Sequence, residues 1–200
     1  IGSKTVKRGE FVFDFGSPAS YLVYTHMDGI AKRTGAEIVW RPMLLGGVFK
    51  ATGNASPAMV PAKGKWMNAD LARFARRYGV EFNRNPFFPV NTLVMMRGAA
   101  AFEGTPQFRP YVDAMFKAMW IDGKNMNDLP TAAGVLKAAG FDPADFMAKA
   151  ESQPAKDRLK ATTEEAVARG VFGAPTTFVG DHMFFGQDRL DFVEEALRAA

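Results

Sequence analysis

The stretch Phe11-Val12-Phe13-Asp14-Phe15-Gly16-Ser17-Pro18-Ala19-Ser20 decides the fold of this 200-residue chain. An apolar, aromatic-rich run ends at Gly16, and Ser17-Pro18 then opens a long helical pattern. A strand that passes so abruptly into a helix points one side chain and several unpaired backbone N–H groups at the same spot. The helix dipole there favours an anion by roughly 0.3–1 kcal/mol.

Thioredoxin-like proteins carry a C-x-x-C redox pair at such a spot. Here the four residues are Ser17-Pro18-Ala19-Ser20, and the chain contains no cysteine. A thiol that reacts at this helix start must therefore arrive with a ligand. The alternative is purely structural, because Ser at the N-cap followed by Pro is also a common helix start that needs no function.

The order of predicted elements is βαβ, then a helical block, then α-ββα. The first unit is the strand Phe11–Phe15, a helix over 18–34 and a strand over 36–41, which implies a parallel pair. We expect a long irregular loop over 46–61, followed by helical patterns. The later strands are predicted at 176–179 and 183–185, joined by the Gly180-Asp181 turn, and a last helix closes the chain. This order predicts an α/β, thioredoxin-like fold: residues 1–43 and 155–200 form the sheet domain, and 44–154 an inserted all-helical domain.

Composition excludes several classes of function. The net charge is +4, and the basic residues are mixed with acids, so a nucleic-acid-binding surface is not expected. Without cysteine there are no disulfides, and the two histidines are far apart, so no metal site is expected. No apolar run reaches the length of a signal peptide or a membrane span, which predicts a soluble, cytoplasmic protein without membrane contact.

Two further segments resemble parts of a binding groove. Gly173-Ala174-Pro175 precedes a strand, where a cis peptide and an unpaired Ala174 backbone would suit an extended peptide-like ligand. An ordinary proline-led strand entry is the alternative. Near the last helix, Asp188 is a candidate N-cap, and Gln187 with Asp188 could also bind an amino-acid head group.

In a thioredoxin-like fold these three segments converge on one groove. Together they fit a tripeptide thiol, with its sulfur at Ser17 and its cysteinyl backbone at Ala174. Its γ-glutamyl head would lie at Gln187 and Asp188.

Five segments resemble the 2-hydroxychromene-2-carboxylate isomerases, relatives of the kappa-class glutathione transferases within the DsbA-like group. They are Ser17-Pro18-Ala19-Ser20-Tyr21, Pro42-Met43-Leu44-Leu45-Gly46-Gly47-Val48-Phe49-Lys50-Ala51-Thr52-Gly53-Asn54, Asn85-Pro86-Phe87-Phe88-Pro89-Val90-Asn91-Thr92, Gly173-Ala174-Pro175-Thr176 and Gly186-Gln187-Asp188-Arg189-Leu190. The resemblance covers nearly the whole chain. It implies the DsbA/kappa-type fold with a helical insert, bound glutathione and a homodimer.

The resemblance also implies the reaction and the residues. It implies interconversion of 2-hydroxychromene-2-carboxylate and trans-o-hydroxybenzylidenepyruvate, as in naphthalene-type catabolism, through a glutathione thiolate activated by Ser17. The glutathione-binding residues it implies are Ser17, Asn54, Ala174, Gln187, Asp188 and Arg189. For the small aromatic carboxylate substrate it implies Lys50 and Asn54, and we expect Phe88 to contact the aromatic ring. Arg41 and Arg97 are further candidates for the substrate carboxylate, and Met43, Trp66 and Phe87 for its ring.

Two other functions stay open on the sequence. One is a kappa-like glutathione transferase or peroxidase, which uses the same thiolate site with a different pocket. The other is a non-catalytic thioredoxin-like binding module. A Ser-His-Asp hydrolase is disfavoured, because Ser17 lacks the G-x-S-x-G context.

Overall fold

A mixed four-stranded sheet organises residues 5–200, the part of the chain that the computed structural model describes. Its strands are β1 (Arg8–Phe13), β2 (Glu37–Pro42), β3 (Thr176–Val179) and β4 (His182–Phe185), in the order β2-β1-β3-β4. β1 and β2 are parallel, as the βαβ pattern predicts, whereas β3 is antiparallel to β1 and to β4. Because Val12 pairs with Thr176, the segment after β1 and the segment before β3 meet at the same end of the sheet.

Helices make up most of the remaining chain. They are α1 (Pro18–Thr34), α2 (Leu45–Thr52), α3 (Pro61–Tyr78), α4 (Leu93–Phe102), α5 (Phe108–Trp120), α6 (Leu129–Ala138), α7 (Pro143–Ala150), α8 (Gln153–Ala168) and α9 (Leu190–Ala199), with short 3-10 turns η1 (Pro57–Met59) and η2 (Gln187–Arg189).

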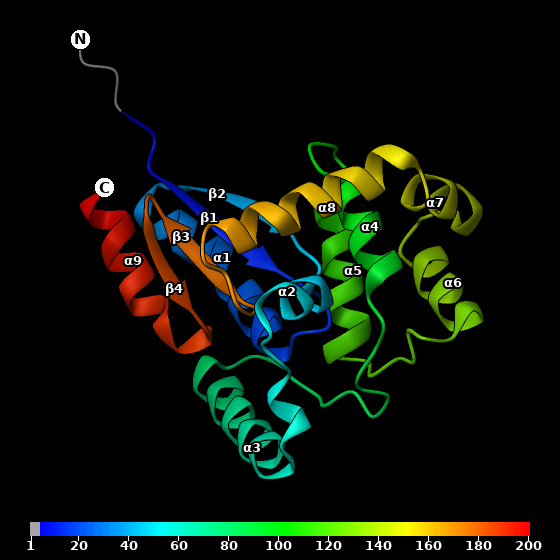
Figure 1. Cartoon of the computed structure of the whole chain (residues 1–200), viewed down its shortest axis with the longest axis horizontal. Coiled ribbons are helices and arrows are strands. Elements are labelled where there is room, and N and C mark those ends of the chain that lie inside the picture. Colours follow the sequence, from blue (N-terminus) through cyan, green and yellow to red (C-terminus); the bar gives the residue numbers. More distant parts are fainter. Residues whose placement is uncertain (1–4) are drawn as a thin grey trace.

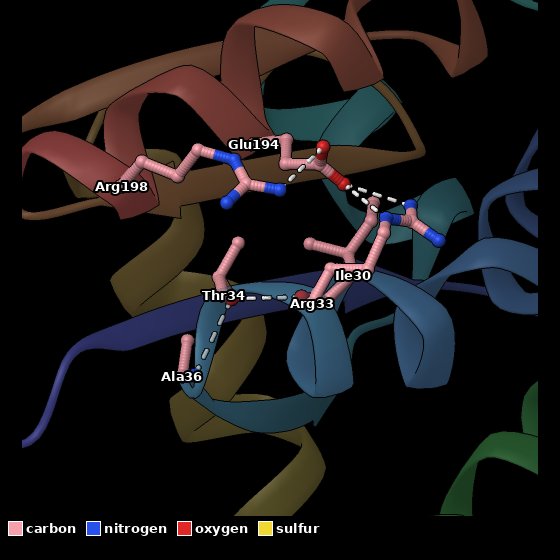
Figure 2. Close-up of polar contacts among 6 residues, drawn as sticks. All are labelled: Ile30, Arg33, Thr34, Ala36, Glu194 and Arg198. Carbon is pink, nitrogen blue, oxygen red and sulfur yellow. Dashed lines mark hydrogen bonds and ion pairs between the residues drawn. The ribbon is translucent and has the colours of Figure 1, made fainter.

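The predicted bounds of α1 are confirmed. Ser17 caps its start with Pro18 in the first turn, and Gly35 ends it at φ 70°, a left-handed conformation that glycine adopts readily. The end of α1 is held against α9 by an ion pair of 2.7 Å between Arg33 and Glu194, with Arg198 on the second carboxylate oxygen at 3.3 Å (Figure 2).

The two faces of the sheet contribute to different apolar clusters. Phe11 and Phe13 belong to the large core that includes α1 and α9. Val12 and Phe178 point the other way and pack in a smaller cluster whose helical members come from α2 and α8. Figure 1 agrees, with α2 and α8 in front of the sheet and α1 behind it.

The long helical region is joined to the sheet by aromatic packing. The Phe15 and Phe116 rings lie 4.9 Å apart, and Trp120 donates its indole N–H to the Phe15 carbonyl at 2.8 Å. Helices α4–α7 gather at one end of the molecule, whereas α3 projects from its body (Figure 1). The division at 43/44 and 154/155 stays a prediction. Within residues 5–200, no helix combines the length and the apolar character that crossing a membrane requires.

Candidate functional site

The turn between β1 and α1 presents Ser17 at the start of a helix, as predicted. Ser17 is extended (φ −97°, ψ 115°), 5% exposed, and its Oγ accepts a hydrogen bond from the Ser20 N–H at 3.1 Å. Pro18 has no N–H to donate. Among residues 5–200 the Ala19 N–H has no hydrogen-bond partner, so one donor at the helix start stays available next to the Ser17 hydroxyl.

Ser17 and Ala174, which are 157 positions apart, are brought into direct contact. The Ser17 hydroxyl donates to the Ala174 carbonyl at 3.2 Å, and the peptide bond between Ala174 and Pro175 is cis. No partner of the Ala174 N–H is found within residues 5–200. The second predicted segment therefore offers backbone groups beside the Ser17 hydroxyl.

The third predicted segment adjoins the second. The Gly186 N–H donates to the Pro175 carbonyl at 3.0 Å, which fixes the start of η2 next to the cis-proline turn. Gln187 is buried, and its carbonyl accepts from the Tyr78 hydroxyl at 2.7 Å. η2 also packs against α1, so all three predicted segments lie in one region.

The prediction that Asp188 caps the last helix is wrong. Asp188 lies within η2, and the residue at the N-cap position of α9 is Arg189, whose side chain makes no cap bond. The Asp188 carboxylate is instead 3.2 Å from the Arg189 guanidinium. The 3-10 turn inserted before α9 is the physical reason, because it moves the helix start past Asp188.

The loop predicted over 46–61 is also wrong, since it contains α2 and η1. The two glycines of α2 lowered its helix signal. Gly47 lets α2 pack closely on α8, because a Cβ there would lie 3.2 Å from Thr163 Cγ2. Gly53 (φ 76°) ends α2, and the Asn54 side chain donates to the Phe172 carbonyl at 2.7 Å. Asn54 is thus linked to the segment that leads into Ala174.

Asp14 is the residue near this site to which the sequence assigned no role. It is buried, and its carboxylate accepts from the Gly16 N–H, the Thr92 hydroxyl and the Leu45 N–H, each at 2.8 Å. Burial raises the pKa of Asp14 against the opposing effect of these three bonds. An aspartate inside an aromatic strand run, two residues before glycine, is the signal that could have singled it out.

Among the predicted substrate residues, Asn54 is linked to this hydrogen-bonded region, whereas within residues 5–200 Lys50 and Phe88 form no hydrogen bond to it. Lys50 is exposed on the last turn of α2, and Phe88 is half-buried, with its ring 6.2 Å from Trp120. Two further candidates are engaged elsewhere: Met43 is fully buried in the smaller core cluster, and Arg41 forms a 2.8 Å ion pair with Glu10. Trp66 and Phe87 are exposed, and Arg97 is half-buried on α4.

The histidines do not complete a hydrolytic triad with Ser17. His26 is half-buried; its Nδ1 lies 3.2 Å from the Leu22 carbonyl, its ring packs on Tyr78, and burial lowers its pKa. His182 is exposed on β4. Across residues 5–200 no group of three or more His, Cys, Asp or Glu side chains could hold a metal ion.

Comparison with known proteins shows the family to which this fold belongs. Residues 10–198 match the family model of the DSBA-like thioredoxin domain. The chain is 36% identical to a 2-hydroxychromene-2-carboxylate isomerase of Sphingobium xenophagum, covering 94% of this chain and 96% of that protein. It is 27% identical to glutathione S-transferase kappa 1 of Caenorhabditis elegans, over 96% and 91% of the two chains. A solved structure of a 2-hydroxychromene-2-carboxylate isomerase superposes with a TM-score of 0.84 and 31% identity, covering 95% of this chain and 94% of that one. The chain therefore belongs to the DSBA-like thioredoxin-domain family and, within it, to the group of the 2-hydroxychromene-2-carboxylate isomerases.

Proposed function

We propose that this protein is a glutathione-dependent isomerase that interconverts 2-hydroxychromene-2-carboxylate and trans-o-hydroxybenzylidenepyruvate. The observation that carries the proposal is the 3.2 Å contact of the Ser17 hydroxyl with the Ala174 carbonyl in a chain without cysteine. The relative named as an isomerase supports the reaction. The relative named as a kappa glutathione transferase supports glutathione as the thiol.

The residues at the site fit a tripeptide thiol. The Ser17 hydroxyl can turn from the Ala174 carbonyl to a sulfur, which frees that carbonyl to pair with a peptide-like backbone. The Ala174 N–H is the matching donor. Gln187, Asp188 and Arg189 would hold the γ-glutamyl group, and Asn54 would contact glutathione from the end of α2.

When bound, glutathione supplies a thiol nucleophile that adds reversibly to a conjugated carbon of the substrate. Ser17 and the neighbouring Ala19 N–H favour the anionic form of a sulfur at the helix start, which lowers its pKa. Lys50 would hold the substrate carboxylate by charge, and Asn54 and Phe88 would contact the rest of the substrate.

The direct test is an absorbance assay that follows 2-hydroxychromene-2-carboxylate after mixing with protein and glutathione. We expect equilibration with the ring-opened product only when both are present. Equal rates with and without glutathione would contradict the proposed cofactor.

A kappa-like transferase is the second candidate, because a kappa transferase is among the relatives. An isomerase regenerates its thiol, whereas conjugation or peroxide reduction consumes it. Free thiol measured before and after turnover separates the two, and a net loss would favour the transferase. A calorimetric titration without binding heat would favour a non-catalytic binding module.

We also propose that the working form is a homodimer. Large apolar side chains are exposed around the start of α3, including Met59, Val60 and Trp66. Exposed patches of this kind are typical of association surfaces. Sedimentation of the protein at several concentrations tests this, and a monomer throughout would contradict it.

A further inference from the structure

Asp14 lies where three segments of the site region meet. Its side chain is 1% exposed. One carboxylate oxygen accepts from the Gly16 N–H and the Thr92 hydroxyl, and the other accepts from the Leu45 N–H. These donors belong to the β1–α1 turn, the residue before α4 and the first residue of α2.

The bonds of Asp14 set the turn that carries Ser17. Gly16 directly precedes Ser17, and the Ser17 N–H itself donates to the Asp14 carbonyl at 3.0 Å. The packing here is close, because a Cβ on Gly16 would lie 3.1 Å from Thr92 Cγ2 and 3.3 Å from Asp14 Oδ1. A change at the carboxylate is therefore transmitted to the backbone that orients the Ser17 hydroxyl.

The same carboxylate caps α2. Leu44, at the N-cap position, makes no side-chain cap bond, and the Leu45 N–H is satisfied by Asp14 from another part of the chain. Such an anion at a helix start is electrostatically favourable. α2 ends at Gly53 and leads into Asn54, so Asp14 connects the Ser17 turn to the helix that carries Lys50 and precedes Asn54.

We propose that Asp14 is a positioning residue: its carboxylate holds the Ser17 turn and α2 in a fixed relation, so that both meet one glutathione molecule. The expected effect on the glutathione thiol rests on the proposed function, whereas the coupling between the Ser17 turn and α2 does not. Asp14 does not touch the ligand. Its effect on the thiol passes through the orientation of Ser17.

Asp14→Asn separates this role from plain packing, because it keeps the volume and exchanges one acceptor for a donor. Backbone N–H groups only donate, so an amide can serve Gly16 or Leu45 but not both. A contrasting control is Asp142→Asn at the start of α7, because Asp142 accepts two backbone N–H groups through a single oxygen, Oδ1, and an amide oxygen can keep both bonds. That helix lies at the far end of the helical region (Figure 1).

The first measurement is amide hydrogen exchange without glutathione. We expect faster exchange in Asp14→Asn at Gly16 or Leu45, with the disturbance extending to Ser17. The control Asp142→Asn removes the same charge but keeps its backbone bonds, so exchange at Gly16, Ser17 and Leu45 should stay at the wild-type rate. Wild-type exchange at Gly16, Ser17 and Leu45 in Asp14→Asn would overturn the coupling.

The second measurement is a double-mutant cycle on the pKa of the bound glutathione thiol, followed by thiolate absorbance. We expect Asp14→Asn to raise that pKa and to lower kcat/KM about tenfold, the equivalent of losing roughly one charged hydrogen bond. In a Ser17→Ala background Asp14→Asn should change the thiol pKa no further. If the effects of the two substitutions on the thiol pKa add, Asp14 does not act through Ser17 and the proposal is overturned.

Failure of the two proposals can be told apart. If wild-type protein does not bind glutathione, the proposed function fails, and hydrogen exchange still decides the coupling. If it binds and Asp14→Asn leaves the thiol pKa unchanged, only the role of Asp14 fails. Should Asp14→Asn not fold, Thr92→Val is the second variant. It removes the hydroxyl that shares Asp14 Oδ1 with the Gly16 N–H, so we expect altered exchange at Gly16 and a shifted thiol pKa. If neither changes, the proposal is overturned.

Discussion

Ser17 combines two roles that need the same local geometry. As an N-cap it accepts from the Ser20 N–H at 3.1 Å, and as a donor it contacts the Ala174 carbonyl at 3.2 Å. A hydroxyl can do both at once, since it has two lone pairs and one hydrogen. In the proposed function, helix stability and thiol activation therefore depend on the same oxygen atom.

The first prediction is that Ser17→Ala lowers glutathione-dependent kcat/KM by about 10- to 100-fold, the equivalent of one hydrogen bond to an anion. Loss of the cap should also lower the free energy of unfolding by about 1 kcal/mol. Steady-state kinetics and urea unfolding measure the two effects. The control is Ser152→Ala, because Ser152 caps α8 in the same way at 3.3 Å. It should match the stability loss and keep full activity; equal activity of the two variants would contradict the activating role.

Helix α3 has a part in the site that its sequence pattern does not reveal. Its last residue, Tyr78, donates to the Gln187 carbonyl at 2.7 Å and so anchors η2. In the sequence, Tyr78 falls on one apolar helical face with Leu71, Phe74 and Ala75, and that pattern gives no information on its hydroxyl.

The second prediction is that Tyr78→Phe weakens glutathione binding by several-fold, up to about tenfold, for the loss of one neutral hydrogen bond. Calorimetry measures the change. Tyr24→Phe is the matched control, because Tyr24 donates to Asp113 at 2.5 Å, away from η2. Equal affinities in the two variants would mean that η2 does not need its anchor.

The third prediction concerns the packing of α4. A Cβ at Gly98 would collide with the Phe146 ring of α7 and lie 2.6 Å from the Tyr111 hydroxyl of α5. Gly98→Ala should therefore destabilise the fold by about 1–3 kcal/mol through overpacking. Gly134→Ala, on α6 with open space around its Cβ, should instead be neutral or stabilise by about 0.5–1 kcal/mol. Thermal unfolding distinguishes the two variants. A Gly98→Ala variant as stable as the wild type would contradict the close packing of α4 against α5 and α7.

At the level of elements, local signals predicted the later strands and the capped helix well, but β1 is Arg8–Phe13 and not Phe11–Phe15 as predicted, because Asp14 and Phe15 already belong to the turn before α1. The bounds of α1 follow from Ser17, Pro18 and Gly35, and the hairpin follows from Gly180-Asp181. α2 was missed because its start is capped by Asp14, which is 31 positions away in the sequence. No local pattern contains that contact.

At the level of the whole molecule, Glu10 of β1 links the neighbouring strand β2 to the segment just after α8. Its carboxylate pairs with Arg169, just after α8, at 2.6 Å and with Arg41 of β2 at 2.8 Å. Burial of Glu10 opposes its charged form, but the bonds from Arg169 and Arg41 outweigh burial and lower its pKa. A lowered pKa in the folded state contributes stability above the unfolded value of about 4.3, and this is lost as pH falls through the folded pKa.

The fourth prediction is that Glu10→Gln lowers the free energy of unfolding near neutral pH by about 1.5–3 kcal/mol. The difference from wild type should shrink on acidification, as the wild-type carboxylate is protonated. Urea unfolding across that pH range measures it. Glu164→Gln, in an exposed pair at 3.9 Å from Lys160, should cost under about 0.5 kcal/mol at any pH. A pH-independent difference for Glu10→Gln would contradict the assigned ion pairs.

The site as a whole was predictable only where sheet topology determines it. Ser17 follows β1 and Ala174 precedes the antiparallel β3, so their meeting follows from the strand order. The surroundings of Lys50 and Phe88 depend instead on how α2–α7 pack, which helical periodicity does not determine. This explains why the thiol side of the site was predicted in more detail than the substrate side.

We infer that this protein, which has no cysteine, activates the thiol of bound glutathione at Ser17. Because the chain contains no cysteine, thiolate absorbance in its complex with glutathione belongs to the ligand alone. A pH titration of that absorbance should give a thiol pKa below about 7.5, against about 8.5 for a free thiol, and Ser17→Ala should move it back towards the free value. A bound thiol that titrates like free glutathione, or one unaffected by Ser17→Ala, would contradict the account.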